Sequence, residues 1–246
     1  MTIFGCDFSD YDWDRGSMNM SAMRADGISF VTHKLTELAS NGAVFYHSNI
    51  KEFWNRSLKA GFPFIGCYVV VRSDVSVAQQ VATALRYVNH TWLDFPGFFW
   101  QVDTERWPYD SVKLSQGTEM CRQLEVVTGK QAVHYASVGQ YGLSWHQPYP
   151  RWNARYPLWN NGTATSYRAH YRAAYNMAGG DRGSGWLDST KIWQYTDNGI
   201  VGKQVRVDCN AYKGTEADFG KMIGAHEFAP PAPVSSATNS ISVWMG

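Results

Sequence analysis

Strand-like and helix-like segments alternate along the first half of the chain, and this alternation restricts the possible folds more than any other feature. Short apolar runs rich in β-branched and aromatic residues predict strands at 3–8, 28–34, 64–71, 98–102 and 131–135. Apolar side chains at helical spacing predict the intervening helices at 17–26, 49–60, 76–88 and 111–128. Because parallel strands need long crossover connections, the pattern predicts a parallel sheet covered by helices.

The alternation fades after residue 136, where a region rich in Gly, Asn and Tyr shows little helical pattern. Three further short strands are predicted at 158–159, 191–195 and 205–207. Five βα units followed by three strands would close an eight-stranded barrel, and 246 residues is close to the usual length of about 250 for such a barrel. We therefore expect an α/β fold, an irregular TIM-like barrel of type (βα)5β3.

The C-terminal end has a different composition, rich in Pro, Ala and Ser over residues 229–240. Such a composition is typical of a linker. We therefore predict a single domain over residues 1–228 and a tail over residues 229–246.

Charge and hydropathy limit the possible partners. Lys and Arg number 22 against 21 Asp and Glu, so the net charge of +1 gives no support for nucleic-acid binding. No apolar run of 18 residues predicts a membrane span, and the N-terminal residues do not resemble a secretory signal. We expect no nucleic-acid partner, no membrane partner and a monomer.

The cysteines and histidines do not suggest a metal site. Cys6, Cys67, Cys121 and Cys209 are widely spaced, without a Cys-x-x-Cys arrangement, and the seven histidines show no metal-ligand spacing. We expect reduced thiols that pack as small hydrophobic groups, with Cys6 and Cys209 close together if the barrel closes. No metal site is expected.

Two carboxylates end the fourth predicted strand, at Asp103 and Glu105. Residues i and i+2 of a strand point to the same face, with Cα atoms roughly 7 Å apart. Buried carboxylates are costly unless they are paired or serve a function. Asp7 and Asp208 also follow predicted strands, and function in a βα barrel concentrates at the C-terminal ends of strands.

The chemistry that suits such a group is cleavage of a glycosidic bond. One carboxyl group must carry a proton near neutral pH, and crowding with other acids raises its pKa. Glu105, with the longer side chain, is the candidate general acid, and Asp103 is the candidate charge stabiliser. The alternative is structural, with each acid capping a loop or pairing with a base such as Arg106 or Arg206.

An ordered set of motifs over about residues 3–214 resembles the family-25 glycoside hydrolases, the Chalaropsis-type lysozymes common among phage endolysins. The motifs that carry the resemblance are Gly5-Cys6-Asp7-Phe8-Ser9, Phe30-Val31-Thr32-His33-Lys34-Leu35-Thr36-Glu37, Ala60-Gly61 through Gly66-Cys67-Tyr68, Val102-Asp103-Thr104-Glu105, Ile192-Trp193-Gln194-Tyr195-Thr196, and Val207-Asp208-Cys209-Asn210.

The resemblance implies cleavage of the β-1,4 bond between N-acetylmuramic acid and N-acetylglucosamine in bacterial peptidoglycan. It implies that Glu105 is the general acid/base and that Asp103 stabilises developing charge, while Asp7 and Asp208 complete an acidic floor. By position, Tyr68, Tyr135, Trp159 and Trp193 are expected to line the substrate groove. The resemblance also implies that the protein needs no metal and no organic cofactor.

Two other functions stay open at this point, namely a wall-binding module without catalysis and a hydrolase of another N-acetylated glycan such as chitin. The family together with the N-terminal sequence favours a phage endolysin. Such a protein is made in the host cytoplasm without a signal peptide and acts on the cell wall after release.

Overall fold

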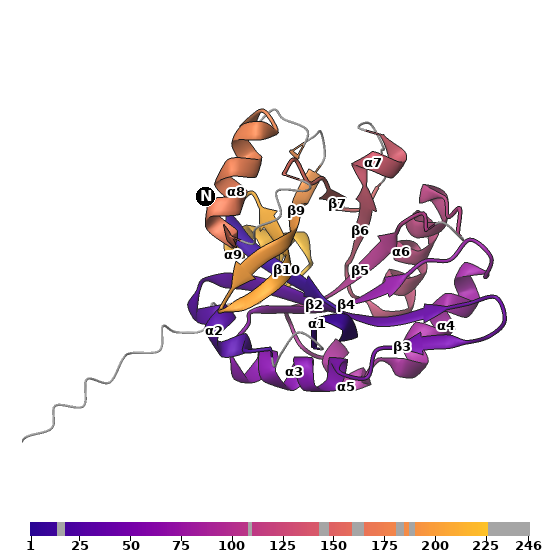
Figure 1. Cartoon of the computed structure of the whole chain (residues 1–246). Helices are drawn as coiled ribbons and strands as arrows, with labels where there is room; N and C mark the ends of the chain where they lie inside the picture. Colours follow the sequence, from indigo (N-terminus) through magenta and orange to yellow (C-terminus); the bar gives the residue numbers. More distant parts are fainter. Residues whose placement is uncertain are drawn as a thin grey trace, which may run out of the picture.

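A computed structural model describes residues 1–13, 18–107, 110–142, 148–158, 165–180, 185–186 and 190–225, and in it eight strands close into a barrel (Figure 1). Around the barrel the strands follow in the order β1 (Ile3–Phe8), β2 (Ile28–Leu38), β4 (Phe64–Val70), β5 (Phe98–Thr104), β6 (Ala132–Ser137), β7 (Arg151–Ala154), β9 (Thr190–Val201) and β10 (Gln204–Tyr212). Two short strands, β3 (Val44–Tyr46) and β8 (Thr165–Ser166), pair with β2 and β9. The predicted eight-stranded TIM-like barrel is confirmed.

The last strand of the barrel runs antiparallel to its two neighbours. Pairings from β1 through β9 are parallel, whereas β10 is antiparallel to both β9 and β1. The expectation that Asp208 follows the end of the last strand was wrong, because β10 continues to Tyr212. Asp208 nevertheless lies beside Asp7, its direct register partner across the β1–β10 pair. Cys6 and Cys209 are register partners too, and both are free buried thiols.

The four predicted helices are present within a few residues of their expected ends. They are α2 (Met20–Ala25), α3 (Ile50–Lys59), α4 (Val77–Tyr87) and α6 (Leu114–Thr128), and Figure 1 shows helices around the outside of the strands. Ser76 caps α4 by accepting a hydrogen bond from the backbone N–H of Gln79. Gly129 ends α6 in the left-handed conformation with φ 67°. Short helices α1 (Asp10–Trp13), α5 (His90–Leu93) and α7 (Val138–Tyr141) complete the connections in this half.

The second half departs from the predictions. The strand expected at 158–159 is instead β7, whose polar Arg151 and Asn153 are buried and hide its pattern in the sequence. The helix α8 (Tyr167–Met177) was not predicted, since its buried face consists of Tyr167, His170 and Ala174 rather than aliphatic residues. The helix α9 (Glu216–Met222) was also missed. The predicted tail at 229–246 lies outside the described residues.

Aromatic side chains fill one end of the barrel. Phe219 of α9 packs against the rings of Phe30, Phe64 and Phe99, with centroids 4.6, 4.8 and 5.5 Å away. The helix follows Tyr212, which pairs with Ile3 at the start of β1. The helix α9 therefore closes the N-terminal end of the parallel strands, leaving polar side chains to line the C-terminal end.

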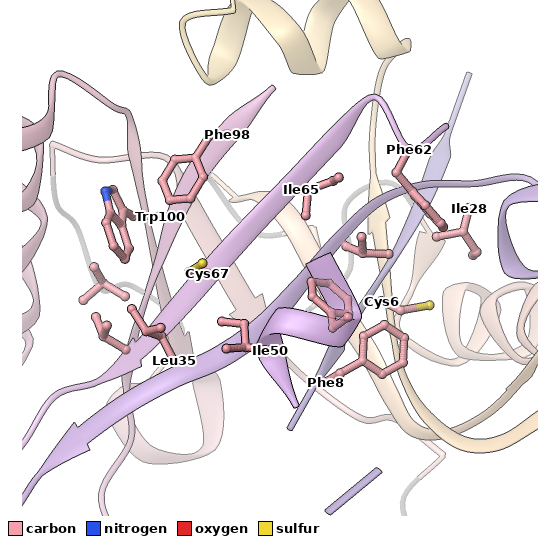
Figure 2. Close-up of a cluster of buried hydrophobic side chains, with 14 of the residues drawn as sticks. Cys6, Phe8, Ile28, Leu35, Ile50, Phe62, Ile65, Cys67, Phe98 and Trp100 are labelled. Atoms are coloured by element: carbon pink, nitrogen blue, oxygen red, sulfur yellow. The ribbon is translucent and has the colours of Figure 1, made fainter. Parts of the chain in front are cut away.

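A second hydrophobic layer lies between the strands and the helices. Figure 2 shows part of it, where strand residues Cys6, Cys67 and Trp100 gather with Ile50 of α3. Because side chains alternate along a strand, each residue that enters this layer sets its neighbours facing the barrel interior. The neighbours Asp7, Tyr68 and Gln101 all line one pocket inside the barrel.

Candidate active site

The inward-facing residues at the C-terminal ends of the strands form a single pocket with a volume of about 870 Å³. We call it the acidic pocket. The predicted site residues that line it are Asp7, Tyr68, Asp103, Glu105, Tyr135 and Asp208. The structure therefore brings together four acids that lie up to 201 positions apart in the chain.

Two of the predicted groove residues are not among those that line the acidic pocket. Trp159 lies outside the described residues. The assignment of Trp193 to the groove was wrong, because this residue of β9 is fully buried and does not line the pocket. Its ring packs against Trp186, and its indole N–H donates to the backbone oxygen of Arg155 at 2.8 Å. Its neighbour Gln194 has the opposite orientation and faces the pocket.

Asp103, at the end of β5, is more enclosed than Glu105. Only 6% of it is exposed, and its Oδ1 has no hydrogen-bond partner among the described residues. Burial raises its pKa well above the usual value, and the nearby charge of Glu105 raises it further. The ammonium of Lys34 acts in the opposite direction. An acid oxygen left free in a pocket is available to a ligand.

Glu105 directly follows β5 and is partly exposed to the pocket. Burial, followed by the charge of Asp7, raises its pKa to about 7. The hydroxyl of Tyr135 lies 3.4 Å from its Oε1. A general acid works best when its pKa lies near the working pH, so Glu105 is suited to proton donation at neutral pH.

Asp7 and Asp208 occupy the opposite wall. Burial raises the pKa of Asp7 to about 6, and hydrogen bonds from Asn210 and Gln194 limit that rise. Burial raises the pKa of Asp208 well above its usual value, and the charge of Asp7 adds to the effect. The four acids thus differ in their tendency to ionise because their surroundings differ.

Gln194 is the main residue that sequence reasoning missed. Its side chain contacts Asp7, Tyr135 and Tyr156, so it links three walls of the pocket. A usable signal was present in the sequence: a polar residue stands between two aromatic residues, Trp193 and Tyr195, in an otherwise apolar strand. A buried polar side chain at such a position needs specific partners.

A network of charges borders the pocket beside β2. Lys34 Nζ donates to Oε2 of Glu37 at 2.9 Å, and Arg72 donates to Oε1 at 3.1 Å. Arg72 is also ion-paired with Asp110 at 2.7 Å. Lys34 lowers the pKa of both Asp103 and Glu105. The network therefore holds one cation next to Asp103 and Glu105.

Two exposed aromatic rings stand among the residues that line the pocket. Tyr11 of α1 is 70% exposed, and Trp107, after β5, is 41% exposed. Flat aromatic faces in a pocket suit stacking on flat ligands. Among the described residues, no group of three His, Cys, Asp or Glu side chains could hold a metal ion. The helices in the same part of the chain include none that is long and apolar enough to cross a membrane.

Comparisons with known proteins agree with this arrangement. The profile described as glycosyl hydrolases family 25 matches residues 6–203. No curated protein matches the sequence at a significant level.

Solved structures resemble the chain in fold. A family 25 glycosyl hydrolase from Bacillus anthracis has a TM-score of 0.64 at 20% identity, covering 89% of this chain and 92% of that one. A bacterial lysozyme from Streptomyces coelicolor has a TM-score of 0.65 at 19% identity, covering 90% and 96%. A muramidase from Trichobolus zukalii has a TM-score of 0.62 at 18% identity, covering 90% and 98%. At these identities the likeness concerns the fold, and the profile match decides the family. The chain belongs to the glycosyl hydrolases of family 25.

Proposed function

We propose that this chain is a muramidase, a lysozyme that hydrolyses the β-1,4 bond between N-acetylmuramic acid and N-acetylglucosamine in bacterial peptidoglycan. The observation that carries the proposal is the pair of unequal acids at the C-terminal end of β5, with Glu105 at a pKa of about 7 beside the more deeply buried Asp103. Membership of family 25 supports it, as do similar solved structures described as a lysozyme and a muramidase.

In the proposed reaction Glu105 first acts as the general acid. It transfers its proton to the glycosidic oxygen as the bond from that oxygen to the anomeric carbon breaks. It then accepts a proton from the water that adds to the anomeric carbon. One water is consumed and one new reducing end forms, so the enzyme returns to its starting state.

Asp103 is proposed to stabilise the positive charge that develops on the sugar ring. Its buried and unpartnered Oδ1 is also suited to accept a hydrogen bond from the N–H of the substrate's acetamido group. That contact would orient the acetamido oxygen for attack on the anomeric carbon. Both roles need an ionised carboxylate, which the nearby ammonium of Lys34 favours.

The groove that receives the glycan is proposed to include Tyr68 and Tyr135, both of which line the acidic pocket. Tyr135 is 6% exposed, so it contributes its hydroxyl edge rather than an open ring face. The exposed rings of Tyr11 and Trp107 are better suited to stacking on sugars that extend beyond the pocket.

Purified cell walls provide the direct test. Mass spectrometry of the released fragments should find new reducing ends on N-acetylmuramic acid, and Glu105→Gln should abolish their release. Glu119→Gln is a matched control, because Glu119 belongs to a surface pair with Arg122 on α6. Cleavage of chitin oligomers but not of walls would favour a different N-acetylated glycan as substrate. Wall binding without new reducing ends would favour a binding module.

We also propose that the protein serves as a phage endolysin, acting on the wall after release from the host cytoplasm. A similar solved structure, described as the CTP1L endolysin, has a TM-score of 0.54 at 14% identity and covers 89% of this chain and 69% of that one. Expression in the cytoplasm of a bacterium should leave the cells intact until the membrane is permeabilised, and rapid lysis should then follow. Lysis before permeabilisation would contradict this role.

A further inference from the structure

The side chains around Asp7 fix which group donates and which group accepts in each of its hydrogen bonds. An indole N–H can only donate, and Trp152 donates to Oδ1 of Asn210 at 2.8 Å. The amide nitrogen of Asn210 therefore faces Asp7, to whose Oδ2 it donates at 2.7 Å. Asp7 must be the acceptor in this contact.

Gln194 approaches Asp7 from the other side with the same polarity. Its Nε2 lies 3.1 Å from Oδ1 and 2.9 Å from Oδ2 of Asp7. Its Oε1 accepts the hydroxyl of Tyr135 at 2.8 Å, and that of Tyr156 as well. Reversing this amide would place its oxygen against the carboxyl oxygens of Asp7. Both oxygens of Asp7 thus accept hydrogen bonds, as those of an ionised carboxylate do.

Asp208 has different surroundings, although it lies directly opposite Asp7. The titratable groups that interact with it come from β1, α1, β4, β9, its own strand and the segment after β7. They are Cys6, Asp7, Asp12, Tyr68, Tyr156, Asp197 and Cys209. All of them are acids. Asp208 is the direct register partner of Asp7 across the antiparallel β1–β10 pair, and both side chains line the acidic pocket. Two adjacent carboxyl groups resist carrying two negative charges, and the N–H donors from Gln194 and Asn210 favour the ionised form of Asp7.

We propose that Asp7 and Asp208 share one proton near neutral pH, and that this proton resides on Asp208. Asp208 is then a neutral hydrogen-bond donor in the active site, and Asp7 is a fixed carboxylate. Gln194 and Asn210 are positioning residues that enforce this difference. With one shared proton, this pair of acids holds one negative charge rather than two, which reduces their mutual repulsion.

The shifts in ionisation agree with this assignment. The pKa of Asp7, at about 6, is limited by the hydrogen bonds from Asn210 and Gln194, so this group is mostly ionised at neutral pH. For Asp208, burial and its acidic neighbours all raise the pKa.

The direct test is NMR of the aspartate carboxyl carbons in isotope-labelled protein, titrated through the neutral range. Asp7→Asn and Asp208→Asn assign the two resonances. At neutral pH the Asp208 carbon should have the chemical shift of a carboxylic acid, and the Asp7 carbon that of a carboxylate. Two ionised groups, or a proton on Asp7 instead, would overturn the proposal. The measurement itself uses the unmodified enzyme.

A second measurement tests the positioning role of Gln194. Gln194→Met removes N–H donors from Asp7 and should raise its pKa by about one unit or more. Gln101→Met is the matched control, because Gln101 lines the same pocket but accepts its hydrogen bond from Thr32 at 2.5 Å. It should leave the Asp7 titration unchanged. Equal shifts in both variants, or no shift in Gln194→Met, would contradict the positioning role.

The catalytic consequence rests on the proposed muramidase function. Asp208→Asn keeps a neutral donor, whereas Asp7→Asn sets an amide N–H against the donors of Gln194 and Asn210. The loss of kcat should therefore be at least about tenfold greater for Asp7→Asn than for Asp208→Asn. Equal losses, or a greater loss for Asp208→Asn, would contradict the proposal. An unmodified enzyme inactive on walls would count against the proposed function, while the NMR result would still locate the proton.

Discussion

The ammonium of Lys34 lies 2.9 Å from the carboxylate of Glu37, and this ion pair borders the acids of the active site. Arg72 holds the second oxygen of Glu37 at 3.1 Å. The cation is therefore kept beside Asp103 and Glu105 by a partner that is itself anchored. A flexible lysine side chain would otherwise have considerable freedom to move away.

Removing this cation should move the pH dependence of catalysis. Lys34 lowers the pKa of both Asp103 and Glu105, so Lys34→Met should raise both. The proposed reaction needs an ionised Asp103 and a protonated Glu105. Both limbs of the pH–rate profile should therefore move to higher pH, by about one unit. Initial rates of wall solubilisation across the pH range measure the effect. Lys34→Arg keeps the charge and should leave the limbs close to their original positions; a profile that does not move in Lys34→Met would contradict this assignment.

Glu105→Gln should lose activity and gain stability. Removing a general acid typically lowers kcat by roughly 10²- to 10⁴-fold. The folded-state pKa of Glu105, about 7, exceeds the usual value of 4.5, so the folded protein binds the proton more tightly than the unfolded chain. The stability contributed by this group is complete below pH 4.5 and is lost as the pH rises through 7.

The Glu105→Gln variant has no ionisable group at this position, so it should not lose stability as the pH rises through 7. Its free energy of unfolding should exceed that of the original protein by roughly 1–2 kcal/mol at pH values above about 8, and by much less at acidic pH. Urea unfolding at the two pH values gives the comparison. A difference that is the same at both values would show that the stability change does not come from ionisation of Glu105.

Gly117 allows α6 to pack closely on β5 and β6, beside Asp103 and Glu105. A Cβ at this position would lie 2.1 Å from Oγ1 of Thr104 and 2.3 Å from Nε2 of His134. Gly117→Ala should therefore lower stability by about 1–3 kcal/mol, despite the better helix propensity of Ala. Thr104 lies between Asp103 and Glu105 in the chain, so activity should fall as well.

Thermal unfolding and wall lysis measure these two effects. Ser115→Ala, an exposed substitution on the same helix, is the control for helix propensity. A Gly117→Ala variant as stable as the Ser115→Ala variant would mean that the helix can move away from the strands at little cost.

Tyr11 and Trp107 should contribute to substrate binding without contributing to the fold. Both rings are largely exposed, so Tyr11→Ala and Trp107→Ala should leave the unfolding temperature nearly unchanged. Loss of a stacking ring should raise KM by about three- to tenfold, with a smaller change in kcat. Phe45→Ala is a suitable control, since Phe45 is also exposed but does not line the acidic pocket. A comparable rise in KM in the Phe45 variant would place the glycan elsewhere.

Several parts of the fold could be read from the sequence because local patterns encode them. The strands at 3–8, 64–71 and 98–102 are apolar runs of the right length, and α4 shows an apolar stripe with a serine cap. The helix α8 could not be read in this way, since it buries a tyrosine, a histidine and an alanine. These side chains are buried by tertiary packing, and the sequence shows no helical periodicity of aliphatic residues from which α8 could be predicted.

In the candidate site, too, some features could be predicted from the sequence and others could not. That Asp103 and Glu105 share one face of a strand follows from the two-residue period alone, and their residue types indicate glycosidic chemistry. The period did not reveal which of Trp193 and Gln194 faces the pocket, because both phases of the alternation are buried in a barrel strand. Alternate side chains of such a strand pack against the helices, and those between them face the barrel interior.

The barrel class and the acids with their order along the chain could be predicted from the residues alone. How each acid ionises could not, because its ionisation depends on neighbours brought from distant strands. The antiparallel return of β10 sets Asp208 opposite Asp7, and Gln194 and Asn210 supply hydrogen bonds to Asp7. A pKa is a property of the surroundings, and these surroundings exist only after the barrel closes.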